Sequence, residues 1–415
     1  MESKYVKLSE VASVLNSTVD KKSRENEEKV KLCNYVDIYK HWSINFSFKN
    51  DFMNATATQK EILNFSLKKG QVAFTKDSEK RDDIGVSTYI SEDMNGVLLG
   101  YHTTLVTPNK EVLDGAYLNA YFNSKFMQKY FELNASGSGQ RFTLSIEVLN
   151  DIPVKLIHIE EQRKIGLLFT YIAKKINNNN KIINELQELS KLIYNYWFVQ
   201  FDFPNEEGKP YKLSGGKMVW NEELKREIPE GWEVSDLNYF VTFVNKKELP
   251  DKRKKLIDLS VISSNTLVQN EFNSGDFSDT NLFELQEGDI LFGSIRPYLK
   301  KYAIAPFDGL VAGTIHSMRV KNLEYHSFIT NIIMSDPFIG YAINSSEGTK
   351  MPVIKKEMMQ KFPIVYNNKI VNMYSNLTSL KLVSNLIKQT HSLIEIRDFL
   401  LPLLMNGQVK IRDEE

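Results

Sequence analysis

The chain has 415 residues, of which 42% are hydrophobic and 25% are charged, so it is long enough for two or three globular domains. Lysine plus arginine equals aspartate plus glutamate at 52 each, and this neutral total gives no sign of a polyanionic partner beyond local basic clusters. The single cysteine, Cys33, excludes a disulfide framework and a cysteine-based zinc site. Without a long apolar run or a signal peptide, we expect a cytoplasmic protein with no membrane span.

Residues 1–154 are predicted to form a mixed domain of short strands and turns with one or two helices. Residues 35–38 and 71–74 have the composition of strands, and residues 98–106 alternate enough to form another. Apolar residues recur at helical spacing from 117 to 133. The first predicted domain therefore comprises residues 1–154.

Residues 155–203 contain one long helical pattern, which runs from 160 to 203. Its apolar residues recur with the 3.5-residue period of a coiled-coil seam. Lys175 and Asn179 interrupt the seam as one polar layer, and a buried Asn in such a seam fixes the register of the helices. The alternative is a single amphipathic helix that packs on a globular core. The predicted seam residues are Ile165, Leu168, Ile172, Asn179, Ile182, Leu186, Leu189 and Ile193.

Residues 204–232 are polar and rich in glycine, proline and charge, which predicts a linker. After it the plan repeats, with a second domain at 233–363, a second long helix at 364–406 and a tail at 407–415. The repeat is carried by matched segments in the same order: Lys31-Leu32 with Lys255-Leu256, Gly70 to Phe74 with Gly288 to Phe292, and Ile152-Pro153-Val154 with Phe362-Pro363-Ile364.

Two similar helices with matched seams are predicted to pack against each other, and the linker makes them antiparallel. The predicted fold is therefore α+β, with two similar mixed α/β domains separated by two long antiparallel helices that form a coiled-coil-like spacer. Pro402 is expected to end or kink the last turn of the second helix, because proline lacks an N–H. The predicted seam of the second helix comprises Leu382, Leu386, Leu393, Ile396 and Leu400.

The sequence contains no motif that predicts catalysis. Gly348-Thr349-Lys350 has the wrong order for a P-loop, and Glu207-Gly208-Lys209 resembles the end of a nuclease motif but lies in the linker. The six histidines are scattered without metal spacing. His102 and His316 are expected to be hydrogen-bonded structural residues or polar readers of a ligand. We therefore predict a chain that is not an enzyme.

Basic and polar residues recur beside turns at corresponding places in both halves. Backbone N–H groups in glycine and serine turns suit phosphate oxygens, and arginine and glutamine suit the edges of guanine and adenine. The alternative is that these residues only solvate loops. The predicted DNA-binding residues are Lys76, Lys80, Arg81, Ser138, Gln140, Arg141, Lys252, Arg253, Lys254, Arg296, Tyr298, Lys300, Thr349 and Lys350.

The chain resembles the specificity (S) subunits of Type I restriction–modification systems along nearly its whole length. The resemblance is carried by Ile152-Pro153 with Glu161-Gln162-Arg163, by residues 196–203, by Ile228 to Trp232 and by the tail at 400–407. The second helix departs from the pattern, because Asn367-Asn368-Lys369-Ile370 stands where the first has its Glu-Gln pair.

The resemblance implies a tandem repeat with pseudo-twofold symmetry, in which residues 1–154 and 233–363 are two target-recognition domains. Together these domains would read a bipartite, asymmetric site in double-stranded DNA. It also implies two DNA methyltransferase (modification) subunits and motor-nuclease (restriction) subunits as partners. S-adenosylmethionine, ATP and Mg²⁺ would then be bound by those partners, and no cofactor or metal by this chain. The second hypothesis is a coiled-coil scaffold whose duplicated domains bind protein.

Overall fold

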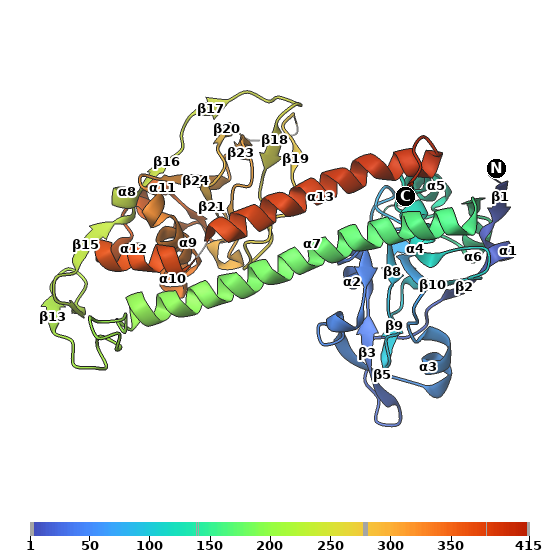
Figure 1. The fold of residues 1–415 in the computed structure, drawn as a ribbon, viewed down its shortest axis with the longest axis horizontal. Helices are drawn as coiled ribbons and strands as arrows, with labels where there is room; N and C mark the ends of the chain where they lie inside the picture. Colours follow the sequence, from blue (N-terminus) through green and yellow to red (C-terminus); the bar gives the residue numbers. More distant parts are fainter. Residues whose placement is uncertain (1–3, 138, 140, 277–280, 379, 413–415) are drawn as a thin grey trace. The chain divides into compact units, whose positions relative to one another are not determined.

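The structure is a computed structural model that describes residues 4–137, 139, 141–276, 281–378 and 380–412 (Figure 1). The chain divides into two compact units: unit 1 comprises Met1–Ile176 and Leu393–Glu415, and unit 2 comprises Asn177–Ser392. Each unit thus contains part of both long helices. Within the described ranges, no helix is both long and apolar enough to cross a membrane.

Unit 1 has a five-stranded sheet in the order β2-β10-β6-β8-β4 and a three-stranded sheet in the order β5-β3-β9. Its strands are β1 (Lys4–Lys7), β2 (Ala12–Asn16), β3 (Glu28–Cys33), β4 (Ser43–Ile44), β5 (Met53–Ala57), β6 (Val72–Thr75), β7 (Asp77–Ser78), β8 (Ser87–Ile90), β9 (Val97–Leu99), β10 (Thr103–Pro108), β11 (Phe142–Thr143) and β12 (Pro153–Leu156). Its helices are α1 (Leu8–Val11), α2 (Tyr35–Lys40), α3 (Gln59–Phe65), α4 (Gly115–Phe122), α5 (Lys125–Asn134), α6 (Ile146–Asn150) and the start of α7 (Ile159–Tyr194), with a 3-10 turn at Phe46–Phe48.

Unit 2 has a four-stranded sheet in the order β16-β24-β21-β22 and a five-stranded sheet in the order β17-β20-β23-β18-β19. Its strands are β13 (Met218–Asn221), β14 (Arg226–Pro229), β15 (Glu233–Asp236), β16 (Val241–Phe243), β17 (Lys247–Glu248), β18 (Lys255–Ile257), β19 (Asn273–Ser274), β20 (Leu282–Leu285), β21 (Ile290–Gly293), β22 (Tyr302–Ile304), β23 (Gly309–Ala312), β24 (Ile315–Val320), β25 (Ser346–Glu347), β26 (Val353–Ile354) and β27 (Pro363–Tyr366). Its helices are α8 (Leu237–Phe240), α9 (His326–Met334), α10 (Asp336–Asn344), α11 (Lys356–Gln360), α12 (Asn368–Leu377) and the start of α13 (Leu380–Asn406), with 3-10 turns at Pro297–Leu299 and Leu323–Tyr325.

The two units repeat one topology. The order β2-β10-β6-β8 in unit 1 corresponds to β16-β24-β21-β22 in unit 2, and the pair β1-β12 corresponds to β15-β27. The parallel pairs also correspond, since Leu32 pairs with Leu98 in unit 1 and Leu256 pairs with Leu310 in unit 2. The predicted α+β tandem repeat is confirmed at the level of strand order.

Matched residues of the repeat have the same local roles. Gly70 and Gly288 both have positive φ, at 95° and 85°, and make the tight turn before a buried strand. Phe74 and Phe292 at the ends of those strands are fully buried. Each packs on a helix of its own unit, Phe74 on Phe131 and Phe292 on Phe338, with ring centroids 6.1 and 5.3 Å apart. The core of each unit is therefore built around the matched strand.

Three local predictions were wrong. Residues 35–38 lie in α2, because the Asp37 carboxylate accepts a hydrogen bond from the Asn34 N–H at 2.8 Å and so closes a helix start. The helix predicted at 117–133 is two helices, since Ser124 caps a new one. The strand predicted at 98–106 is split into β9 and β10 by a turn at residues 100–102.

The long helices were predicted as single elements, and this holds for the first. α7 is continuous from Ile159 to Tyr194 and continues as a π-helical turn at Asn195–Val199 (Figure 1). The second is divided into α12, which ends at Leu377, and α13, which begins at Leu380. Pro402 lies inside α13 and does not end it, because the helix runs on to Asn406.

Within each unit the two long helices run antiparallel. In unit 1, Glu161 near the start of α7 pairs with Lys410 beyond the end of α13, at 3.8 Å. Further along α7, Phe169 contacts Trp42, whose ring also lies under Arg397 of α13. In unit 2 the buried Asn179 side chain donates to Gln389 Oε1 at 3.0 Å and Thr390 Oγ1 at 3.2 Å.

The buried stripe of α7 differs from the predicted heptad. Ile165, Ile172 and Asn179 are buried and Leu168, Leu186 and Ile193 are half-buried, whereas Ile182 and Leu189 are exposed. Phe169, Ile176, Ile183 and Ser190 are also buried. Each lies one residue after a position of the predicted seam or its polar layer, namely Leu168, Lys175, Ile182 and Leu189. These buried residues keep the seven-residue spacing of the predicted seam, but part of the stripe is rotated by one residue, because α7 packs on a globular unit as well as on a second helix.

On α13 the whole stripe is displaced by one residue. Leu382 and Ile396 are exposed, and Leu386, Leu393 and Leu400 are half-buried. The buried residues of α13 are Leu380, Val383, Ile387, Thr390, His391, Leu401, Leu404 and Met405. One residue corresponds to about 100° of rotation in an α-helix, which is enough to turn a predicted seam residue to the edge of the contact.

Candidate nucleic-acid interface

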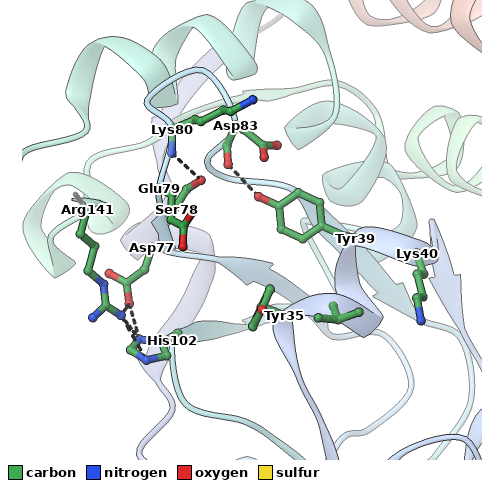
Figure 2. Close-up of a pocket in the computed structure, with 11 residues that line it drawn as sticks. Tyr35, Tyr39, Lys40, Asp77, Ser78, Glu79, Lys80, Asp83, His102 and Arg141 are labelled. Carbon is green, nitrogen blue, oxygen red and sulfur yellow. Dashed lines mark hydrogen bonds and ion pairs between the residues drawn. The ribbon is translucent and has the colours of Figure 1, made fainter. Parts of the chain in front are cut away.

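An open hollow of about 720 Å³ in unit 1 gathers several side chains of the kinds sought in the sequence (Figure 2). It is lined by Tyr35, Val36, Tyr39, Lys40, Asp77, Ser78, Glu79, Lys80, Asp83, His102 and Arg141. These residues come from α2, from the segment after β6, from the turn before β10 and from the segment before β11. We call residues 76–78, 101–102 and 141–143 tip 1.

Asp77 is the centre of tip 1. Its Oδ1 accepts a hydrogen bond from Thr143 Oγ1 at 2.5 Å, and its Oδ2 accepts from His102 Nδ1 at 2.8 Å and from Arg141 Nη2 at 3.1 Å. Lys76 Nζ lies 3.4 Å from the same Oδ2. Figure 2 shows Asp77, His102 and Arg141 pointing toward one another at one side of the hollow.

The electrostatics of tip 1 keep Asp77 charged. Burial of the carboxyl raises its pKa, but the hydrogen bonds from Thr143 and His102 and the charges of Lys76 and Arg141 outweigh burial, so the pKa is lowered overall. The Asp77 side chain is 9% exposed, while that of Arg141 is 53% exposed. A buried anion thus holds a guanidinium that remains open to solvent.

The backbone at His102 has φ of 74°, a left-handed conformation that is uncommon for residues other than glycine. The preceding residue is Tyr101, whose ring centroid lies 4.1 Å from that of the His102 imidazole. Lys76 Nζ lies over the same tyrosine ring. This conformation directs the imidazole to Asp77. His102 is therefore a hydrogen-bonded residue, as expected from the sequence.

The opposite side of the hollow is aromatic. Tyr35 and Tyr39 are 44% and 38% exposed, and their rings are in edge contact with centroids 6.5 Å apart. The Tyr39 hydroxyl donates to the Asp83 carbonyl at 2.7 Å, which fixes the ring at the edge of the hollow (Figure 2). Exposed aromatic faces beside charged groups are suited to contacts with nucleic acid.

The corresponding place in unit 2, which we call tip 2, comprises residues 294–298, 314 and 351–353. Its backbone hydrogen bonds repeat those of tip 1. The Lys76 N–H donates to the His102 carbonyl and the Leu144 N–H to the Lys76 carbonyl, at 3.3 and 2.8 Å. In tip 2, the Ser294 N–H donates to the Thr314 carbonyl and the Ile354 N–H to the Ser294 carbonyl, at 2.9 and 3.0 Å.

The side chains of the two tips are unlike. The strand partners Asp77 and Thr143 of tip 1 correspond to the bridge partners Ile295 and Val353 of tip 2. Gly137 and Gly348 both have positive φ, and a Cβ on either would meet the carbonyl oxygen of the residue that closes its turn, Arg141 in tip 1 and Met351 in tip 2. Met351 therefore stands where tip 1 has Arg141, and it is 58% exposed.

The predicted DNA-binding residues lie partly at the two tips and partly elsewhere. Lys76 and Arg141 lie at tip 1, and Lys80 lines the hollow beside it. Arg81 donates a hydrogen bond to the Ala135 carbonyl and stacks on Phe142. Ser138 and Gln140 lie outside the described residues. Arg296 and Tyr298 are exposed in tip 2, with Thr349 and Lys350 exposed in its closing turn.

Three of the four remaining predicted basic residues, Arg253, Lys254 and Lys300, are engaged in ion pairs. Lys300 lies 2.9 Å from Asp336. Arg253 and Lys254 lie on the loop between β17 and β18 and pair with Asp251 and Glu248, each at 2.9 Å, while Lys252 is exposed beside them. The predicted basic cluster at 252–254 thus carries its own counter-charges, which reduces its net attraction for phosphate.

Sequence reasoning missed Asp77 and the two tyrosines, although Asp77 lies only two residues after the matched strand β6. The signal that could have found it is the exchange of Asp77 for Ile295 between otherwise matched segments. Within the described residues, no group of three or more histidine, cysteine, aspartate or glutamate side chains could hold a metal ion. Cys33 is buried, and burial raises the pKa of its thiol.

The fold and tips define a class of protein: a tandem repeat of an α+β unit, with each copy joined to a long helix and presenting a variable tip. No protein-family model matches the chain. The chain is 25% identical over 379 residues to the Type I restriction enzyme MjaIX specificity subunit of Methanocaldococcus jannaschii, an alignment that covers 86% of this chain and 82% of the relative.

Two further comparisons point the same way. The chain is 30% identical over 159 residues to the Type I restriction enzyme EcoDI specificity subunit of Escherichia coli, which covers 37% of this chain and 35% of the relative. The crystal structure of the Type I restriction–modification S subunit from M. genitalium matches with a TM-score of 0.52 and 15% identity, over 100% of this chain and 97% of that one, and shows the shared fold. The predicted resemblance to Type I specificity subunits is confirmed.

Proposed function

We propose that this chain is the non-catalytic DNA-recognition subunit of a Type I restriction–modification complex. The observation that carries the proposal is the repeated tip. Two units of one topology present the same hydrogen-bonded backbone with different exposed side chains, as expected of a protein that reads two DNA sequences with one framework. The relatives named as specificity subunits support the same conclusion.

Each unit would read one half of a bipartite target. Tip 1 offers charged donors and acceptors around Asp77, while tip 2 offers the apolar Met351 and Val353 beside Arg296. Base pairs are distinguished in the major groove by hydrogen-bond donors, acceptors and the thymine methyl group, so tips of such different chemistry would select different bases. The target is therefore asymmetric in this proposal.

Methyltransferase subunits would bind along the long helices, and motor-nuclease subunits would join them for cleavage. Large apolar side chains are exposed along the first long helix within both units. They are Leu167 and Tyr171 on α7 in unit 1, and Leu189 and Leu192 on α7 with Tyr196 in the following π-helical turn in unit 2. Exposed apolar groups at such spacing are typical of protein contacts. S-adenosylmethionine, ATP and Mg²⁺ would be bound by these partners.

The test is selection of duplexes from a randomised DNA pool by the full chain co-expressed with its methyltransferase. We expect enrichment of two fixed half-sites separated by unread base pairs. The logarithm of the binding constant should fall linearly with the logarithm of the salt concentration. A scaffold whose domains bind protein would enrich no sequence. That outcome would contradict the proposal.

A further inference from the structure

The polar network of tip 1 is not required by the fold. Tip 2 makes the corresponding backbone hydrogen bonds with Ile295 and Val353 in place of Asp77 and Thr143. The whole set is exchanged together, because Met351 also stands where tip 1 has Arg141. Because the same backbone framework forms in tip 2 without this network, the network in tip 1 has a role other than holding the framework.

The geometry gives Asp77 and Arg141 different roles. Both oxygens of Asp77 are engaged, Oδ1 by Thr143 and Oδ2 by His102 and Arg141, so its acceptor capacity is used within the tip. Arg141 contacts Asp77 and His102 through Nη2, and its side chain is half exposed at the hollow. Because the guanidinium is a rigid planar fork, fixing one of its nitrogens fixes the direction of the others.

A guanidinium beside its own carboxylate is poorly suited to bind phosphate, because the two charges offset each other. Its direction is fixed, and Nη1 and Nε keep their N–H donors for a base edge, since Nη2 is the nitrogen that contacts Asp77 and His102. Guanine presents two acceptors, N7 and O6, in the major groove, and this pair fits the arginine fork in a bidentate contact. The hollow beside the fork, with Tyr35 and Tyr39 on its far side, leaves room for the base edge (Figure 2).

We propose that Arg141 reads a guanine in the half-site bound by unit 1 and that Asp77 is the positioning residue that holds it. This inference rests on the proposed function and specifies the base and the residues. The corresponding Met351 of tip 2 has no donors, so the guanine belongs to one half-site. Removal of one bidentate contact reduces discrimination against the wrong base by about 5- to 140-fold.

The experiment compares duplex selection by the full wild-type chain, Arg141→Lys, Asp77→Asn and their combination, each co-expressed with the methyltransferase. Lysine keeps the charge but lacks the fork, so Arg141→Lys separates base reading from charge. Glu132→Gln, which removes a half-buried carboxylate paired with Lys129 on α5, is the matched control for Asp77→Asn. Thermal unfolding of every variant reports whether unit 1 remains folded.

We expect the wild-type chain and Glu132→Gln to select a guanine at one fixed position of one half-site. Arg141→Lys and Asp77→Asn lose that preference, keep the other half-site and keep their affinity for random DNA. The combined variant is no worse than Arg141→Lys alone, because Asp77 acts through Arg141. Retention of the guanine by Arg141→Lys, or an equal loss on all sequences, would overturn the inference. If the wild-type chain selects no sequence, the proposed function fails as well, whereas a bipartite site unchanged by the variants refutes this inference alone.

Discussion

The buried ion pair of unit 2 offers a quantitative test of the tandem repeat. Asp289 is 1% exposed and accepts hydrogen bonds from Arg319 Nε and Nη2 at 2.8 and 2.9 Å. At the corresponding position of unit 1, Gln71 donates to Thr107 Oγ1 at 2.8 Å. The side-chain oxygens of Asp289 and Gln71 have a second role in common, because each caps the turn before its matched strand. Asp289 accepts a hydrogen bond from the Gln286 N–H, and Gln71 accepts one from the Lys68 N–H.

The two single variants are expected to differ in cost. Asp289→Gln keeps the turn acceptor but leaves Arg319 without its carboxylate. Because the Arg319 side chain is 35% exposed and lies 3.6 Å from Glu284, water and that second carboxylate limit the loss to about 2 kcal/mol. Arg319→Thr leaves a buried carboxylate unpaired, which costs about 3–5 kcal/mol. The double variant rebuilds the neutral pair of unit 1, so it should lose about 1 kcal/mol.

Urea denaturation followed by tryptophan fluorescence measures these changes in the full chain. Trp197, Trp220 and Trp232 all lie in unit 2, so the signal reports mainly that unit. The double-variant cycle isolates the coupling between the two side chains. If the double variant loses as much as the sum of the single variants, the positions do not form an exchangeable pair, and the correspondence between the units fails at this site.

Three further predictions concern single positions. Burial lowers the pKa of His41 to about 4 from an ordinary 6.5, so the free energy of unfolding of unit 1 should fall by up to about 3 kcal/mol as the pH falls from 6.5 to 4. His41→Phe, whose ring can pack on Phe48 as the imidazole does, should flatten this pH dependence when unfolding is measured across that pH range. Lys80→Ala should weaken binding to all sequences alike and reduce the salt slope by about one, and an unchanged slope would place Lys80 off the DNA. Asn179→Ala should cost about 1–3 kcal/mol in urea denaturation, because it removes two buried hydrogen bonds between α7 and α13, and a smaller loss would mean that water replaces them.

The sequence was sufficient to predict the repeat because buried strands tolerate few exchanges. The matched segments at Gly70–Phe74 and Gly288–Phe292 place a turn glycine and a buried phenylalanine at the same spacing, and the structure gives them the same roles. Local helix starts at Asn34 and Ser124 were missed, since hydrogen bonds at these caps override the strand or continuous-helix pattern around them.

Tip 1 could not be assembled from the sequence. Asp77 meets His102 and Arg141 across 25 and 64 residues of chain, and no local pattern joins them. The heptad located the helices but placed part of their contact one residue away, because apolar residues that face a globular unit and those that face a helix overlap on one surface. A sequence period cannot resolve which of two adjacent apolar faces is buried more deeply.

The long helices lead to a last prediction, that their length sets the number of unread base pairs in the target. The boundary between the units falls after Ile176 on α7 and after Ser392 on α13, so insertions at both places leave the contacts within each unit unchanged. Four residues lengthen an α-helix by about 6 Å and turn the remainder of that helix by about 400°, close to one full turn. With DNA rising about 3.4 Å per base pair, the paired insertion should lengthen the preferred spacer by about two base pairs. A paired insertion of two residues turns each helix by about 200° and should abolish selection. Sites methylated by each variant with its methyltransferase give the spacer directly, and an unchanged spacer in the four-residue variant would mean that the partner subunits, not the helices, place the two units on DNA.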